Sequence, residues 1–241
     1  MTKYLLRMSY DGTNYYGFQR LKGHPSIQNE LEKALQRVFK QDVEIKGAGR
    51  TDKNVHALDQ CASFDAPFEI KNDKLIKAIN RYLPMDIRIT NCEKVSNDFH
   101  ARFSVKRKIY EYKINIGTYN PLINNYYYQP NYKINLNKIK KASKVFIGVY
   151  DFNNFVSGSY SNTISKINDI KIIKKKNVIT IRIIGTHFYK YMVRNIVGAL
   201  MDYNKDKVSI NDLMQMLEKP EQKKQLTTIS PNGLYLTKIY Y

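Results

Sequence analysis

An arginine and an aspartate stand two residues apart in a short glycine-rich stretch, GAGRTDKNVHA, at residues 47–57. Arg50 could hold Asp52 through a charge-assisted, bidentate pair, which would keep the carboxylate ionised and aimed. Such a carboxylate can act as a nucleophile or stabilise a developing positive charge. The plain alternative is a turn, because Asp-Lys-Asn favours hydrogen bonds to nearby backbone amides and tolerates left-handed conformations.

Two further side chains are candidates because of their type and position. Tyr110, in KIYEY, offers a ring face and a hydroxyl, although a tyrosine in an alternating strand is more commonly a packing residue. Arg194, in MVRN, could bind an anion or could be an ordinary solvated helix residue, and Gly198 one turn later favours close approach of another element. We expect His56 to be a structural hydrogen-bonding residue rather than a catalyst.

The chain is strongly basic, with 40 Lys and Arg against 21 Asp and Glu and a formal net charge of +19. Residues 1–100 hold 16 basic and 13 acidic residues, whereas residues 101–241 hold 24 and 8. A charge of this size attracts polyanions, and nucleic acid is the obvious one. The alternative is a coding bias, since the chain is also rich in Asn, Ile and Tyr and has no Trp.

Several classes of protein are disfavoured by the composition. Cys61 and Cys92 are too few for a disulfide framework, and the sequence has no Cys-x-x-Cys pair, so we predict no structural zinc. The N-terminus lacks the apolar region of a signal peptide. The most apolar stretch, 178–201, is interrupted by charged side chains, which argues against an ordinary membrane span. We expect a soluble protein of the reducing cytoplasm.

The spacing of apolar residues predicts the same order of elements twice. In the first part we expect strands at 3–10, 43–47, 60–66 and 86–95, a helix from the N-cap Ser26 to about 38, and a helix around 75–83 that Pro84 ends. In the second part we expect strands at 107–117, 166–174, 177–184 and 233–241, helices at about 136–146 and 189–203, and an extra helix at 209–218.

The order β-α-β-β-α-β is that of the split unit of ferredoxin-like domains. We therefore predict an α+β fold of two ferredoxin-like halves, residues 1–104 and 105–241. They would join into one continuous, mostly antiparallel sheet with helices on one face. The open face, or a basic cleft at the seam between the halves, would then be available for a ligand, although the fold alone does not say which.

Eight short motifs occur in an order and at a spacing typical of one known family. They are SYDGTNYYGFQR (9–20), SIQNELEKAL (26–35), GAGRTDKNVHA (47–57), LPMDIR (83–88), FHARFS (99–104), KIYEYKI (108–114), YMVRNIVGAL (191–200) and SPNGLYL (230–236). On these motifs the chain resembles the bacterial tRNA pseudouridine synthase A family over nearly its full length.

The resemblance implies an activity and roles for the candidate residues. It implies that a homodimer binds tRNA and converts uridines at positions 38–40 of the anticodon stem-loop to pseudouridine. Asp52 matches the family's catalytic aspartate, Tyr110 its aromatic contact to the target base, and Arg50 and Arg194 two active-site arginines. The reaction breaks an N–C glycosidic bond and remakes it as C–C on the same base. No atoms are lost and no redox change occurs, so no cofactor is needed.

The residue types suit this reaction. A carboxylate beside the anomeric carbon is required, but the second acid of a glycosidase is not, because the base is retained. A tyrosine ring can stack on a flipped uracil. The chain departs from the family pattern where Lys53-Asn54 replaces Ala-Gly, where Phe18 replaces a tryptophan and where Tyr150 replaces a histidine. Because Asn adopts positive φ angles most readily after Gly, we expect the turn to be kept.

Two clusters of side chains in the second part of the chain could also contact nucleic acid. Residues 106–108, Lys-Arg-Lys, could contact phosphates or charge an edge strand, and residues 126–128, three tyrosines, could stack bases or reflect composition. The rivals are a non-catalytic RNA-binding module of two RRM-like halves, whose RNP pattern is missing, and a base-releasing glycosylase, whose second acid is missing. A pseudouridine synthase with a different RNA target stays open.

Overall fold

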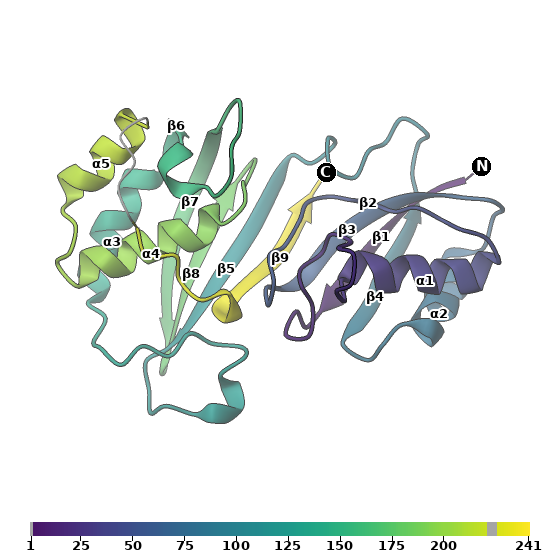
Figure 1. Ribbon diagram of the computed structural model, residues 1–241, viewed down its shortest axis with the longest axis horizontal. Coiled ribbons are helices and arrows are strands. Elements are labelled where there is room, and N and C mark those ends of the chain that lie inside the picture. Colours follow the sequence, from purple (N-terminus) through teal and green to yellow (C-terminus); the bar gives the residue numbers. More distant parts are fainter. Residues whose placement is uncertain (1, 221–225) are drawn as a thin grey trace. The chain divides into compact units, whose positions relative to one another are not determined.

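The computed structural model describes residues 2–220 and 226–241, and the chain divides into two compact units (Figure 1). Unit 1 comprises the residues up to Lys106 together with Tyr235–Tyr241. Unit 2 comprises Arg107–Leu234. The last strand of the chain therefore belongs to the unit in which the chain begins. A pairing between segments so far apart in sequence cannot be predicted from a local pattern.

Unit 1 contains strands and two helices that cover part of its sheet. Its elements are β1 (Thr2–Tyr10), α1 (Ile27–Phe39), β2 (Lys46–Gly47), β3 (His56–Ala66), α2 (Asn72–Tyr82), β4 (Ile87–Lys94) and β9 (Leu234–Tyr240). The strands lie in the order β4-β1-β3-β9, with β2 also paired to β3. Strand β1 is antiparallel to β3 and β4, whereas β9 is parallel to β3.

Helix α1 shows why the sequence folds as predicted in this unit. The side chain of Ser26 accepts a hydrogen bond from the amide of Asn29, which confirms the predicted N-cap. Apolar side chains at helical spacing, including Ile27, Leu31 and Leu35, are fully buried. Full burial of each such side chain contributes about 1.5–3 kcal/mol. The helix ends where Lys40 takes a left-handed conformation, with φ of 59°.

Unit 2, in the residues that the structure describes, is built from an antiparallel sheet and three α-helices. Its elements are β5 (Arg107–Asn115), α3 (Leu136–Ser143), β6 (Gly148–Asp151), β7 (Ile164–Lys175), β8 (Val178–Gly185), α4 (Met192–Asn204) and α5 (Ile210–Glu218), with short 3₁₀ turns η1 (Pro121–Ile123), η2 (Lys144–Phe146), η3 (Asn153–Phe155) and η4 (Pro231–Gly233). The strand order is β5-β8-β7-β6, and every neighbouring pair is antiparallel.

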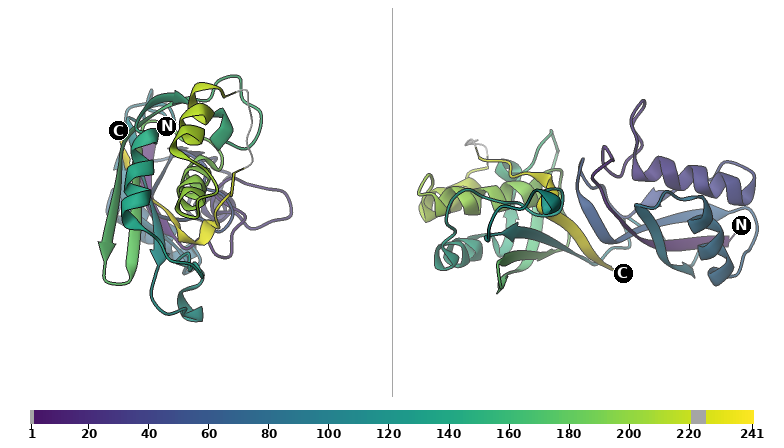
Figure 2. Two further views of the ribbon diagram at one scale, coloured as in Figure 1. Left: turned by 90° about the vertical axis from the view of Figure 1, so that its left-hand side faces the viewer. Right: turned by 90° about the horizontal axis from the view of Figure 1, so that it is seen from below.

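The two faces of the unit 2 sheet differ in polarity. In β8 the side chains of Ile179, Ile181 and Ile183 are fully buried. Arg182, which points to the opposite face, forms an ion pair with Glu111 of β5 at 2.6 Å. Helices α4 and α5 lie to one side of these strands (Figure 2). The α+β class with mostly antiparallel strands is therefore confirmed. Within the described ranges, each helix is either too short or too polar to cross a membrane.

Some predicted elements have different bounds, and one strand was not predicted, each for a visible reason. The strand expected at 43–47 is reduced to β2, because the amide of Ile45 donates to the side chain of Glu32 on α1 instead of to a strand. The helix expected from 189 begins at Met192, because Tyr191 has a left-handed φ of 65°. Strand β6, which contains Tyr150, was not predicted because its four residues are too few to show a period.

Candidate active site

The predicted catalytic residue Asp52 lies on a loop between β2 and β3, here called the aspartate loop (residues 48–55). Hydrogen bonds of Thr51, whose side chain is buried at 6% exposure, hold this loop in place. The hydroxyl oxygens of Thr51 and Tyr10 are 2.7 Å apart, and the Thr51 carbonyl accepts a hydrogen bond from the amide of Phe18. Burial raises the pKa of Tyr10 to about 12, so its hydroxyl stays protonated at neutral pH.

A tight turn sets the backbone that carries Asp52. The amide of Val55 donates to the carbonyl of Asp52 at 3.2 Å, and Asn54 has a φ of 64°. The prediction that Asn54 keeps the positive φ of the usual glycine is thus confirmed. The Asn54 amide also donates to the carbonyl of Tyr15. Both halves of the turn are held, and Asp52 itself is half-buried.

Glycines allow a second loop, residues 11–25, to lie directly against the aspartate loop. A Cβ on Gly12 would stand 2.1 Å from the carbonyl oxygen of Val55, and one on Gly17 would stand 2.5 Å from that of Thr51. Gly17 also has a φ of 104°, which other residues rarely adopt. The two glycines of SYDGTNYYGFQR are therefore needed for close backbone approach, a role that the sequence alone did not indicate.

His56 has the structural role that we predicted. It is 2% exposed, and its Nδ1 lies 3.1 Å from both the amide nitrogen of Gly12 and the Oδ1 atom of Asp11. Its ring is stacked on that of Tyr235, with centroids 4.7 Å apart. The histidine therefore joins the second loop and the last strand to β3.

Arg50, unlike His56, is exposed on the aspartate loop, and its pairing with Asp52 stays a prediction.

Tyr110 lies on the buried face of β5 in unit 2. It is 7% exposed, and its ring contacts that of Phe188 edge to face, with centroids 5.0 Å apart. Tyr112 and Ile114 share this face and are fully buried. The packing interpretation of Tyr110 accounts for these contacts, so its role at the substrate base stays a prediction that needs an activity assay.

Arg194 is held in the first turn of α4. Its Nε donates to the carbonyl of Ile229 at 2.8 Å, and its guanidinium carbon lies 4.5 Å from the ring centroid of Tyr191. The close approach predicted from Gly198 is confirmed, because a Cβ there would stand 1.6 Å from the carbonyl oxygen of Thr227. Arg194 is thus an anchored, half-buried cation, and its contact with substrate stays a prediction.

In each of the two clusters noted in the sequence, residues 106–108 and 126–128, the side chains differ in exposure. Lys106 and Arg107 are exposed, but Lys108 is only 7% exposed and shares the face of Tyr110. Strand alternation counted from Tyr110 was the signal that could have identified this buried lysine. Of the three adjacent tyrosines, Tyr126 is exposed and Tyr127 and Tyr128 are half-buried, and whether they stack bases stays a prediction.

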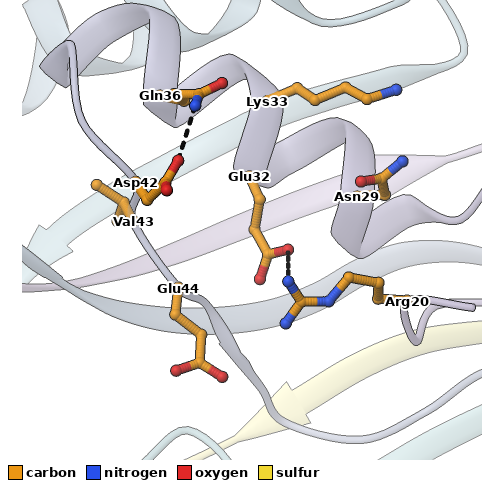
Figure 3. Close-up of a pocket in the computed structure, with 8 residues that line it drawn as sticks. All are labelled: Arg20, Asn29, Glu32, Lys33, Gln36, Asp42, Val43 and Glu44. Atoms are coloured by element: carbon orange, nitrogen blue, oxygen red, sulfur yellow. Dashed lines mark hydrogen bonds and ion pairs between the residues drawn. The ribbon is translucent and has the colours of Figure 1, made fainter. Parts of the chain in front are cut away.

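A separate pocket of about 510 Å³ lies beside α1 (Figure 3). Its lining carries charges of both signs, and the residues are Arg20, Asn29, Glu32, Lys33, Gln36, Asp42, Val43 and Glu44. Arg20 pairs with Glu32 at 3.3 Å, and Gln36 donates to Asp42 at 2.7 Å. None of the four predicted site residues lines this pocket.

The chain thus combines two α+β units and a strongly basic composition with a firmly held loop that carries Asp52. A family model described as tRNA pseudouridine synthase matches residues 7–104 and 142–241. The chain belongs to the tRNA pseudouridine synthase family, and its members are isomerases.

Full-length relatives agree with this assignment. The chain is 38% identical over 244 residues to the tRNA pseudouridine synthase A of a Thermoanaerobacter species, with 100% of both chains covered. It is 38% identical over 240 residues to that of Pseudothermotoga lettingae, with 98% of each chain covered. It is 35% identical over 250 residues to that of Limosilactobacillus reuteri, which covers 100% of this chain and 97% of the relative.

Proposed function

We propose that this chain converts uridine to pseudouridine at positions 38–40 of the tRNA anticodon stem-loop, with Asp52 as the catalytic group. The observation that carries the proposal is the construction of the aspartate loop. Thr51, before Asp52, and Asn54, after it, are both fixed by hydrogen bonds to loop 11–25 or to β1. A carboxylate positioned in this way needs little reorganisation when the reaction begins, which is the condition for electrostatic or nucleophilic catalysis.

The remaining candidates have roles that follow from their chemistry. The ring of Tyr110 would stack on the flipped uracil and orient it. Arg50 would keep the Asp52 carboxylate ionised, because a nearby positive charge favours the charged form of an acid. Arg194, already anchored through Nε, would present the rest of its guanidinium to a phosphate of the substrate.

The reaction needs no cofactor in this scheme. The glycosidic N–C bond breaks, the uracil stays in the site, and a C–C bond forms to the same sugar, so no atom or electron is gained or lost overall. Asp52 would stabilise the electron-poor sugar or form a transient bond with substrate. A second carboxylic acid is unnecessary, because the base is not released to water.

The substrate and assembly follow from charge and from the relatives. The relatives carry the name tRNA pseudouridine synthase A, and the excess of basic residues in 101–241 suits a polyanion. We propose tRNA as the substrate, a homodimer as the working form and the cytoplasm as the location. Affinity for tRNA should then fall steeply with added salt, because each phosphate contact releases counterions.

The proposal can be tested with the purified chain and unmodified tRNA transcripts. One transcript carries uridine at positions 38, 39 and 40, and a matched transcript carries cytidine there. We expect pseudouridine only in the first, mapped by chemical modification and primer extension. Release of free uracil would instead favour the glycosylase, tight binding without any product would favour the RNA-binding module, and pseudouridine elsewhere in the tRNA would reveal a different target.

A further inference from the structure

Two exposed side chains, one from each of two loops, contact the ring of Tyr16, and one of them belongs to the residue that follows Asp52. The Nζ atom of Lys53 lies 3.8 Å from the centroid of the Tyr16 ring. The imidazole of His24 is stacked on the same ring, with centroids 4.1 Å apart and planes inclined by 24°. One aromatic ring therefore contacts both a lysine ammonium and an imidazole, and the lysine directly follows the proposed catalytic Asp52 in the chain.

The backbone fixes this arrangement on the side of the aspartate loop. The amide of Asn54 donates to the carbonyl of Tyr15, and the amide of Phe18 donates to the carbonyl of Thr51. In loop 11–25 these two hydrogen bonds lie on either side of Tyr16 in sequence. In the aspartate loop they lie on either side of Lys53. The ring and the lysine are consequently held in register by main-chain bonds.

The other side of the stack is fixed in the same way. The amide of Tyr16 donates to the carbonyl of Pro25 at 2.9 Å, which brings the ring to the residue that follows His24. The amide of His24 donates to the carbonyl of Leu21, closing a short turn. His24 is thus held against Tyr16 by the path of loop 11–25.

The stack has the properties of an anion site. Lys53 and His24 are exposed, and Tyr16 is 41% exposed. Over residues 2–220 and 226–241, neither Lys53 nor His24 has a carboxylate partner. Contact with a ring face restricts the flexible lysine stem, while its N–H groups can still donate to an oxygen. Such a preorganised point charge suits a phosphate.

We propose that Lys53 and His24, aligned by Tyr16, bind a backbone phosphate of the substrate RNA next to the nucleotide on which Asp52 acts. This inference rests on the proposed function. Because Lys53 follows Asp52 directly on a rigid turn, a phosphate held there would fix the register of the strand at the carboxylate. Lys53 and His24 are therefore substrate-binding residues, and Tyr16 is a positioning residue.

The test compares Lys53→Met and His24→Gln with wild type and with the control Lys77→Met, which removes an exposed lysine from α2. Methionine keeps an unbranched apolar stem but removes the charge. Binding of an anticodon stem-loop is measured over a range of salt concentrations, and KM and kcat are measured on tRNA. Each phosphate contact contributes about 0.7–0.9 to the slope of log K against log salt.

For Lys53→Met we expect a slope that is smaller in magnitude by about one contact, a KM raised several-fold, and an unchanged melting temperature. The His24→Gln variant should change in the same direction, and Lys77→Met should match wild type. A Lys53→Met protein with the slope and KM of active wild type would overturn the inference. Failure of the proposed function would look different, because the wild-type chain itself would then form no pseudouridine.

Discussion

The hydroxyl pair that fastens the aspartate loop to β1 gives a quantitative prediction for Thr51→Val. The hydroxyl oxygens of Thr51 and Tyr10 are 2.7 Å apart, and the residues are only 6% and 5% exposed. Valine has nearly the same shape as threonine but no hydroxyl, so among the described residues the Tyr10 hydroxyl would keep only Gln60 Nε2, at 3.5 Å. Leaving a buried polar group poorly satisfied costs about 1–3 kcal/mol.

This cost should appear both in stability and in turnover. For a protein of this size, about 1 kcal/mol lowers the melting temperature by about 2–4 °C, so Thr51→Val should melt roughly 2–12 °C below wild type. Because Thr51 precedes Asp52, we also expect kcat to fall while the affinity for tRNA changes little. Thermal unfolding followed by circular dichroism and single-turnover kinetics measure the two effects.

A double-mutant cycle isolates the hydrogen bond from other effects of the substitution. Tyr10→Phe alone should cost a similar free energy of unfolding. The double variant should cost less than the sum of the two single variants, by about 0.5–3 kcal/mol, because both remove the same interaction. Strict additivity, or a Thr51→Val protein as stable and active as wild type, would refute the idea that this bond positions the loop.

Gly198→Ala should lower the melting temperature by several degrees in thermal unfolding, because its Cβ would collide with the backbone of Thr227 and overpacking costs about 1–3 kcal/mol; an unchanged value would contradict that contact. Burial raises the pKa of the Cys61 and Cys92 thiols to about 12 from 9.0. Because the pKa of each thiol is higher in the folded than in the unfolded protein, the thiols' contribution to the free energy of unfolding is complete below pH 9 and is lost as the pH rises towards 12. Urea titrations should show the free energy of unfolding falling across that window, and falling less steeply in Cys92→Ala. Tyr110→Phe should keep the fold but slow turnover, whereas Tyr110→Ala should also melt earlier and lose roughly tenfold to a hundredfold in activity, and full activity in both would make Tyr110 a packing residue only.

Much of the fold could be predicted because the relevant forces are local. The apolar spacing and the cap at Ser26 define α1 without help from the rest of the chain. The turn at Asn54 was also predictable, since a positive φ favours Gly and then Asn. The candidate site residues came from the family resemblance, because one acid beside an arginine has too many ordinary explanations on its own.

The features that were missed depend on partners distant in sequence. The length of β2 is set by Glu32, which takes the amide of Ile45 away from any strand ladder. The burial of Lys108 depends on the face that β5 presents to the core of unit 2. The need for Gly17 appears only when a second loop approaches within van der Waals distance. No window of neighbouring residues contains this information.

The stack of Lys53, Tyr16 and His24 illustrates the same limit. Lys53 stood out in the sequence as a departure from the family pattern, but its position over an aromatic ring required the folded loops. A substitution in a motif can thus create a contact that the family pattern does not describe, and the surrounding backbone decides whether that contact is ordered.

The most direct test of the central claim is single-turnover pseudouridine formation by purified Asp52→Asn protein, free of any host enzyme. The matched control is Asp65→Asn, which removes an acid that pairs with Lys3 on the surface of unit 1. We predict that Asp52→Asn folds and binds tRNA like wild type but forms no pseudouridine, while Asp65→Asn stays active. Measurable pseudouridine formation by Asp52→Asn would contradict the assignment of Asp52 as the catalytic group.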